Sequence, residues 1–196
     1  MKPQWSKWAR TTHWISSALG LLSLLSFSVT GITLNHPDWF SANRSVEQRT
    51  LVLTESQHVH WRQQGERAQF ELLAQLLDQQ FALPLPQRFE QDDVEWVFDY
   101  PKPGGVITVV FDVETGELFY EEVNDGWVSL INDLHKGRHS GRVWSGYIDI
   151  TALVCMFFSL TGLWLLWVHA RKRLSTWPLV LAGGLVPLFI YGIFVL

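Results

Sequence analysis

The chain has 196 residues, of which 47% are hydrophobic and only 17% are charged. Its formal net charge is −4, and residues 38–125 carry no basic patch, which argues against a nucleic-acid partner. It contains one cysteine, Cys155, so a disulfide within one chain is excluded.

Three long segments contain no Asp, Glu, Lys or Arg, namely residues 11–37, 150–170 and 174–196. A bilayer core of about 30 Å needs roughly 20 apolar residues in a helix. We therefore predict membrane-spanning helices at 13–35, 147–169 and 178–196. The first apolar segment is too long for a signal peptide and no cleavage site follows it, so we expect an uncleaved anchor that contacts membrane lipid.

Basic residues predict the orientation of these helices. Lys2, Lys7 and Arg10 precede the first helix, and residues 171–173 are all basic. Such clusters stay in the cytoplasm. We therefore expect a cytoplasmic N-terminus (1–12), a cytoplasmic loop (170–177) and a periplasmic domain (36–125), in the inner membrane of a bacterium.

The segment 36–125 has the pattern of a small α+β domain. Residues 67–81 place apolar side chains at helical spacing. Strand patterns follow at 94–100, 106–113 and 118–123, separated by turn residues, and residues 51–53 are a candidate for an earlier strand. The fold class expected is therefore a membrane α-helical protein with an extracytoplasmic domain in which a helix packs on an antiparallel meander.

The next segment, 126–146, is expected to form an interfacial helix and loop. Its first half is amphipathic, with one apolar stripe made of Trp127, Leu130, Ile131 and Leu134. A helix of this kind can lie flat on a membrane surface.

Five histidines stand at the ends of the first two apolar segments: His13, His36, His135, His139 and His169. An ionisable side chain in a membrane segment is costly and is by default a functional hypothesis. Imidazoles that face each other across two helices are typical axial ligands of haem iron. The spacing therefore suggests one or two b-type haems.

For an inner haem we expect His13 and His169, which two antiparallel helices would place at matching depth near the cytoplasmic face. The second ring nitrogen of each would need an acceptor such as a carbonyl. Arg10, Arg171 and Lys172 are candidates to pair with the haem propionates. The alternative for His13 is an interfacial residue within an aromatic belt.

For an outer haem we expect His36 with either His135 or His139. In a straight helix His139 would overshoot His36 by roughly 10 Å and His135 by roughly 16 Å. The glycines at 137, 141 and 146 could break that helix and fold the segment back. The alternative for His36 is a helix-end residue before Pro37.

Two further histidines, His58 and His60, are a weaker candidate site. In an extended strand both rings would point to one side and could bind copper or zinc. A loop position beside Trp61 is the other interpretation. The sequence shows no nucleophile–base motif, phosphate loop or zinc-protease motif.

The turn Phe-Asp-Val-Glu-Thr-Gly-Glu-Leu at 111–118 resembles that of a PepSY domain. Together with His13-Trp14, Leu134-His135 and Thr161-Gly162-Leu163-Trp164, nearly the full chain resembles the PepSY-associated transmembrane family. The resemblance implies a haem-b protein that passes electrons from a cytoplasmic-side donor to a periplasmic acceptor, such as a ferric complex or a partner protein.

The resemblance also favours His135 over His139 as the outer ligand. Larger members carry two PepSY units, so it implies that a homodimer completes the site here. The chain would then be a membrane haem-dependent reductase or its electron-transfer subunit, with any flavin on another chain. The alternative function is a haem-free anchored PepSY module that binds or inhibits a partner protein such as a protease.

Overall fold

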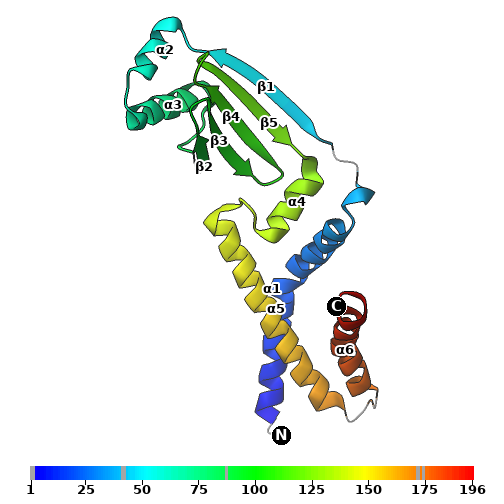
Figure 1. The fold of residues 1–196 in the computed structure, drawn as a ribbon. Coiled ribbons are helices and arrows are strands. Elements are labelled where there is room, and N and C mark those ends of the chain that lie inside the picture. Colours follow the sequence, from blue (N-terminus) through cyan, green and yellow to red (C-terminus); the bar gives the residue numbers. More distant parts are fainter. Residues whose placement is uncertain (1–2, 41–42, 87, 171–172, 174) are drawn as a thin grey trace. The chain divides into compact units, whose positions relative to one another are not determined.

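The computed structural model describes residues 3–40, 43–86, 88–170, 173 and 175–196. The chain divides into two compact units, one made of Met1–Ser28 with Gly146–Leu196 and the other of Val29–Ser145. In its described residues the first unit contains helices and no strand, and the second contains a β-sheet (Figure 1).

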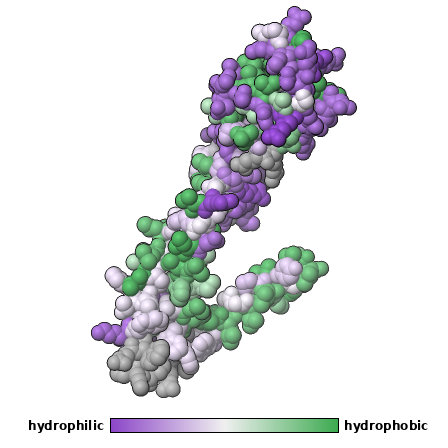
Figure 2. All heavy atoms as spheres, turned by 90° about the vertical axis from the view of Figure 1, so that its left-hand side faces the viewer, coloured by the Kyte–Doolittle hydropathy of each residue, from purple (hydrophilic) through white to green (hydrophobic). Residues whose placement is uncertain are grey.

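The helical unit is built from three long helices, α1 (Pro3–Asn35), α5 (Gly141–His169) and α6 (Thr176–Phe194). All three are long and apolar enough to cross a membrane. Figure 2 shows hydrophobic atoms gathered over these helices and hydrophilic atoms over the sheet. The helices α1 and α5 begin earlier than the predicted spans at 13 and 147. Apolar composition identifies only the part of each helix that lies in the membrane. The helical hydrogen bonding continues into the polar residues before it, so each helix is longer than its apolar segment.

Small side chains let α1 and α5 pack closely and antiparallel. An ideal Cβ on Gly20 would lie 3.0 Å from Cγ1 of Val154, so only glycine fits there without a shift. One end of the contact is polar, with the Ser23 hydroxyl 2.8 Å from that of Tyr147. In the membrane, close packing and interhelical hydrogen bonds replace the hydrophobic driving force. Gly20 therefore serves helix packing.

The sheet domain, defined here as residues 45–124, contains five antiparallel strands in the order β1-β5-β4-β3-β2. The strands are β1 (Ser45–Val52), β2 (Arg88–Gln91), β3 (Glu95–Lys102), β4 (Gly105–Asp112) and β5 (Glu117–Asn124). The meander β3-β4-β5 and the earlier strand agree with the sequence prediction. The short edge strand β2 was not predicted, because four residues are too few to show an alternating pattern.

Helix α3 (Glu66–Phe81) packs on one face of this sheet (Figure 1). Leu73 and Leu77 on the predicted helical stripe are fully buried, and Phe70 and Phe81 are partly buried against the same core. Opposite them the sheet contributes its alternate side chains, Trp96, Phe98, Val109, Phe111, Leu118 and Tyr120. Burial of these large apolar groups is the main stabilising contribution, and it confirms the predicted helix-on-sheet arrangement.

His58 and His60 lie in helix α2 (Glu55–Arg62), in neither a strand nor a loop as the sequence suggested. Thr54 caps this helix, with its hydroxyl accepting from the Gln57 amide and the Gln57 side chain accepting from the Thr54 amide. This capping box is the sequence signal that we missed. Residues two apart on a helix point in different directions, so the pair does not form a two-histidine metal site.

Candidate functional site

The five histidines at the ends of the apolar segments occupy different environments. His13 lies inside α1, His169 ends α5, and His36 follows α1 as the N-cap of the short helix η1 (Pro37–Trp39). His135 lies in the last turn of α4 (Gly126–Lys136), and His139 lies in the loop between α4 and α5. His13, His36 and His135 are half-buried, whereas His139 and His169 are exposed.

The side chain of His13 packs against helix α5. Its Nδ1 atom lies 3.0 Å from the Thr161 hydroxyl and 3.2 Å from the carbonyl oxygen of Phe158. The imidazole stacks on the Phe158 ring, with centroids 4.8 Å apart and 14° between the planes. An ideal Cβ on Gly162 would lie 3.3 Å from Cε1 of His13, tighter than ordinary contact. The ring is therefore held on three sides by one turn of α5.

These contacts assign the hydrogen of the neutral His13 ring to Nδ1. The Phe158 carbonyl can only accept, and the Thr161 hydroxyl donates to the Phe157 carbonyl at 2.7 Å. Both oxygens facing Nδ1 are thus acceptors, so Nδ1 carries the hydrogen and Nε2 carries the lone pair. A backbone carbonyl on the second ring nitrogen is the usual support of a metal-binding histidine.

His169 does not lie at the depth of His13. Its Nδ1 contacts the carbonyl oxygen of Leu165 in its own helix at 2.8 Å. His13 faces Thr161, which is eight residues before His169 and therefore about 12 Å away along α5. The matched depth expected from the sequence is wrong, because the real helix register is offset by two turns. Within one chain, His13 and His169 do not face each other.

His135, which lies on α4, also has its Nδ1 atom next to a threonine hydroxyl of another helix. Its Nδ1 lies 2.5 Å from the hydroxyl of Thr30 on α1. One turn earlier on α4, the Asn132 side-chain oxygen accepts from the Thr33 hydroxyl at 2.6 Å. The other side of α4 is tied to the sheet, since Asp133 accepts from the Gly104 amide at 2.9 Å. Helix α4 therefore holds His135 against the end of α1.

His139 and His36 differ from His135. His139 adopts a left-handed backbone with φ of 53°, between Gly137 and Gly141, both also at positive φ. Gly137 and Gly141 interrupt the helix between α4 and α5, as predicted. The glycine at 146, in contrast, lies within α5. His36 stacks on Trp39, with ring centroids 3.8 Å apart. The cross-helix contact to α1 belongs to His135 and not to His139.

The predicted propionate partners are only partly described. Arg10 lies on α1, three residues before His13, and its side chain is exposed. Arg171 and Lys172 lie outside the described residues. No group of three or more His, Cys, Asp or Glu side chains able to hold a metal ion occurs within the described parts of the chain.

The threonines that support the two histidines were not assigned this role from sequence. Thr161 and Thr30 each lie in an apolar helix, where a hydroxyl usually returns its hydrogen to the preceding turn. The signal was present, because a polar residue in a membrane helix commonly contacts another helix. Which helix it contacts depends on the helix register, which sequence alone does not provide.

The domain and the helices together match a known family over most of the sequence. The model of the PepSY_TM-like family matches residues 4–196. The chain belongs to this family. No match was found among curated proteins or among solved structures. This PepSY_TM-like protein is thus a membrane protein with a PepSY-like α+β domain, as the sequence resemblance indicated.

The PepSY-like domain carries a charged cluster on the helix-covered face of its sheet. Lys102 forms an ion pair with Glu122, and the Tyr120 hydroxyl donates to the same carboxylate at 2.7 Å. The pKa of Glu122 is lowered mainly by the hydrogen bond from Lys102 and, to a smaller extent, by the one from Tyr120. Burial is the main cause, and the hydrogen bond to Glu122 the second, that raises the pKa of Tyr120 to about 12. The Glu122 carboxylate is therefore ionised at neutral pH, whereas the Tyr120 hydroxyl keeps its proton and donates it to Glu122.

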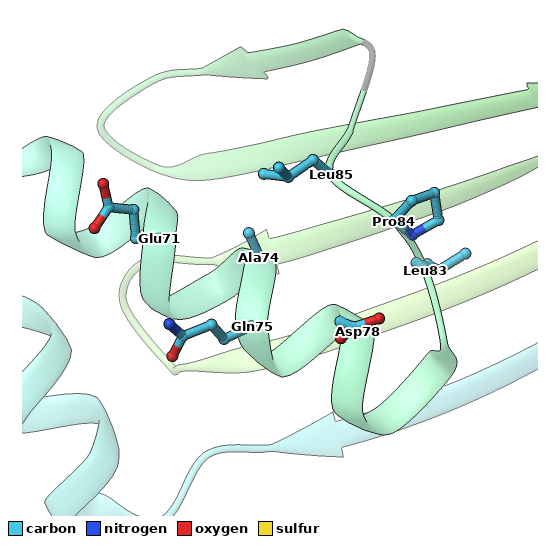
Figure 3. A pocket seen from close by; sticks show the side chains of 7 residues that line it. All are labelled: Glu71, Ala74, Gln75, Asp78, Leu83, Pro84 and Leu85. Carbon is cyan, nitrogen blue, oxygen red and sulfur yellow. The ribbon is translucent and has the colours of Figure 1, made fainter.

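A groove of about 460 Å³ opens on the PepSY-like domain beside α3 (Figure 3). It is lined by Glu71, Ala74, Gln75, Asp78, Leu83, Pro84 and Leu85. Figure 3 shows the α3 residues on one side and the segment 83–85 on the other. Leu85 is 70% exposed, so the groove has an apolar wall open to solvent.

Proposed function

We propose that this protein binds haem b and carries electrons across the cytoplasmic membrane, with His13 and His135 as iron ligands. One observation supports the proposal above the others. Each of these two histidines has its Nδ1 held by a threonine hydroxyl from another helix, at 3.0 Å for Thr161 and 2.5 Å for Thr30. Such support fixes the ring orientation and raises the basicity of a metal-binding imidazole.

At the inner position the protein residues have distinct tasks. His13 presents the lone pair of Nε2, since its hydrogen is assigned to Nδ1. Phe158 and Gly162 confine the ring, which limits the rotamers available to it. Arg10 lies on the same side of α1 at the i−3 position, where its guanidinium can pair with a propionate. These residue types fit a haem.

Haem b would supply one-electron chemistry when bound, so that an electron from a reduced flavin protein would reduce a ferric complex to the ferrous state. His13 would serve the cytoplasmic side and His135 the opposite side. Two sites would divide a crossing of about 30 Å into shorter steps. Their ligands and surroundings would set the potentials.

The orientation in this proposal follows from charge. Lys7 and Arg10 precede the apolar part of α1, and the basic residues 171–173 lie between α5 and α6. Both would stay in the cytoplasm, which places the PepSY-like domain outside, in the periplasm. An acceptor would then dock at that domain or at the membrane surface beside it.

The experiment is to purify the full chain in mild detergent, record a reduced-minus-oxidised spectrum and quantify haem as the pyridine haemochrome. We expect b-type bands in the wild type. The double variant His13→Ala/His135→Ala should lose them, while His60→Ala, at an exposed position on α2, should keep them. A colourless wild-type protein after expression with haem supplied would refute the proposal.

One observation supports a second function, a haem-free module that binds a partner protein. The open groove beside α3 joins an apolar wall at Leu83–Leu85 to the carboxylates of Glu71 and Asp78. A chain segment with apolar and basic residues would complement it. This alternative gains support if the purified protein is colourless.

A further inference from the structure

We infer that the inner haem is shared between two copies of the chain, with His13 of each copy as one axial ligand. The inference rests on the proposed function and specifies its inner site. The twofold axis would run along the membrane normal and pass through the iron. One haem would then serve two chains at this position.

The first step is that one chain supplies a single imidazole at this depth. His169 lies about 12 Å farther along α5 from the Thr161 level. The sulfur of Cys155 lies near Gly20, which is seven residues, or about 10 Å, from His13 along α1. Helix α6 contains no His, Cys, Met or Lys. A bis-histidine iron bound to His13 therefore needs its second imidazole from another copy of the chain, because α1, α5 and α6 hold no further histidine besides His169.

The second step is a symmetry argument. Two copies insert into the membrane with the same orientation. A twofold axis along the membrane normal therefore places each residue of one copy at the same depth as the equivalent residue of the other copy. A ligand from a second copy must lie at the depth of His13. The partner subunit's His13 meets this condition, whereas the partner subunit's His169 has the same offset of about 12 Å as its counterpart.

The third step is that the haem has matching symmetry. An in-plane axis through the iron exchanges the two faces of the porphyrin and also its two propionates. A twofold dimer would offer two equivalent imidazoles to the faces. It would also offer two equivalent guanidiniums, one Arg10 from each copy, to the two propionates. Arg10 precedes His13 and thus lies on the cytoplasmic side, so the propionate edge would face that surface.

The α1 surface that lies about 100° around the helix from His13 is exposed and could form such an interface. Trp14 is 70% exposed and Leu21 is 60% exposed, and His13 itself is only half-buried. Charge complementarity between two arginines and two propionates selects a second copy with haem over lipid as the occupant. Lipid would leave the assigned lone pair of Nε2 without a partner.

The test uses the full chain carrying His135→Ala, which removes the proposed outer ligand. We expect one haem per two chains, a dimer by light scattering, and the six-coordinate low-spin electron paramagnetic resonance signal of a bis-histidine iron. A monomer that binds one low-spin haem per chain would overturn the inference and leave the proposed function intact.

Mixed dimers sharpen the result. Chains with and without His13→Ala, both carrying His135→Ala, are expressed together with two different affinity tags, and the doubly tagged species is isolated. We expect this species to hold a five-coordinate high-spin haem or none. A low-spin haem retained there would overturn the inference, as would loss of the low-spin signal in His169→Ala. Absence of haem from every sample would refute the proposed function itself.

Discussion

The Nδ1 atom of His13 and the hydroxyl oxygen of Thr161 lie 3.0 Å apart, although 148 residues separate them in the sequence. This contact joins two membrane helices and fixes the tautomer of the imidazole, because the threonine hydrogen is donated to the Phe157 carbonyl. It holds the imidazole in one orientation, with the lone pair on Nε2.

Replacing the hydroxyl should therefore weaken haem binding without removing the ligand. Thr161→Val keeps the shape of the side chain but leaves the ring with only the Phe158 carbonyl as acceptor. We expect a 10- to 100-fold loss of affinity for the inner haem, measured by haem titration of the apoprotein. Thr151→Val on the same helix is the matched control, and an equal loss there would argue for a general effect on α5.

The absence of a side chain at Gly162 should also matter. A Cβ there would lie 3.3 Å from Cε1 of His13, and the longer side chain of Gly162→Leu would displace the ring. We expect this variant to lose at least half of the inner haem signal. An ideal Cβ on Gly146 of the same helix meets no atom within 4 Å, so Gly146→Leu should have little effect. Equal spectra for the two variants would contradict the packing explanation.

The outer ligand can be tested by comparing two neighbouring histidines. His135 contacts Thr30 on α1, whereas His139 is exposed and lies in a left-handed loop. We expect His135→Ala to lower the haem content per chain and His139→Ala to preserve it. Quantification by pyridine haemochrome decides the matter, and the reverse result would assign the ligand to His139.

The PepSY-like domain should show a pH dependence from its charged cluster. Because Lys102 and Tyr120 lower the folded-state pKa of Glu122, the contribution is complete above the ordinary value of 4.5 and is lost as the pH falls through the lowered value. We expect Lys102→Met to reduce Tm at pH 7 by no more than about 4–8 °C, since exposed pairs contribute about 1 kcal/mol at most.

The difference in Tm between Lys102→Met and wild type should shrink at pH 3. Tryptophan fluorescence can follow unfolding, because Trp61 and Trp96 lie in the core. Arg67→Met removes a guanidinium that is 93% exposed and is the control, with a smaller change expected at both pH values. A Tm difference independent of pH would show that packing, and not charge, is responsible.

Much of the PepSY-like domain could be read from local patterns. The alternation around Trp96 and Phe98 and the helical spacing of Leu73 and Leu77 predicted elements that the structure contains. Helix α2 was missed because its apolar stripe is weak, although the capping box at Thr54 and Gln57 marks its start. Local geometry sets these periods, so sequence reveals them where the element is long enough.

Local sequence patterns predicted only part of the candidate site. The sequence identified His13 and His135 as functional candidates because an imidazole is costly in an apolar segment. It did not find Thr161 or Thr30, and it paired His13 with His169 by counting residues from the helix ends. The close approach of Gly20 to Val154 has the same register as the contact of His13 with Thr161, and no residue count shows this register.

By itself, then, the sequence determined which segments are apolar, their helical or extended period, and which side chains bear chemistry. These are properties of single residues and their immediate neighbours. Only the tertiary structure decided that His13 faces Thr161 and that α4 carries His135 to Thr30. Register between helices depends on how small and large side chains fit across an interface, and that fit involves residues more than one hundred positions apart.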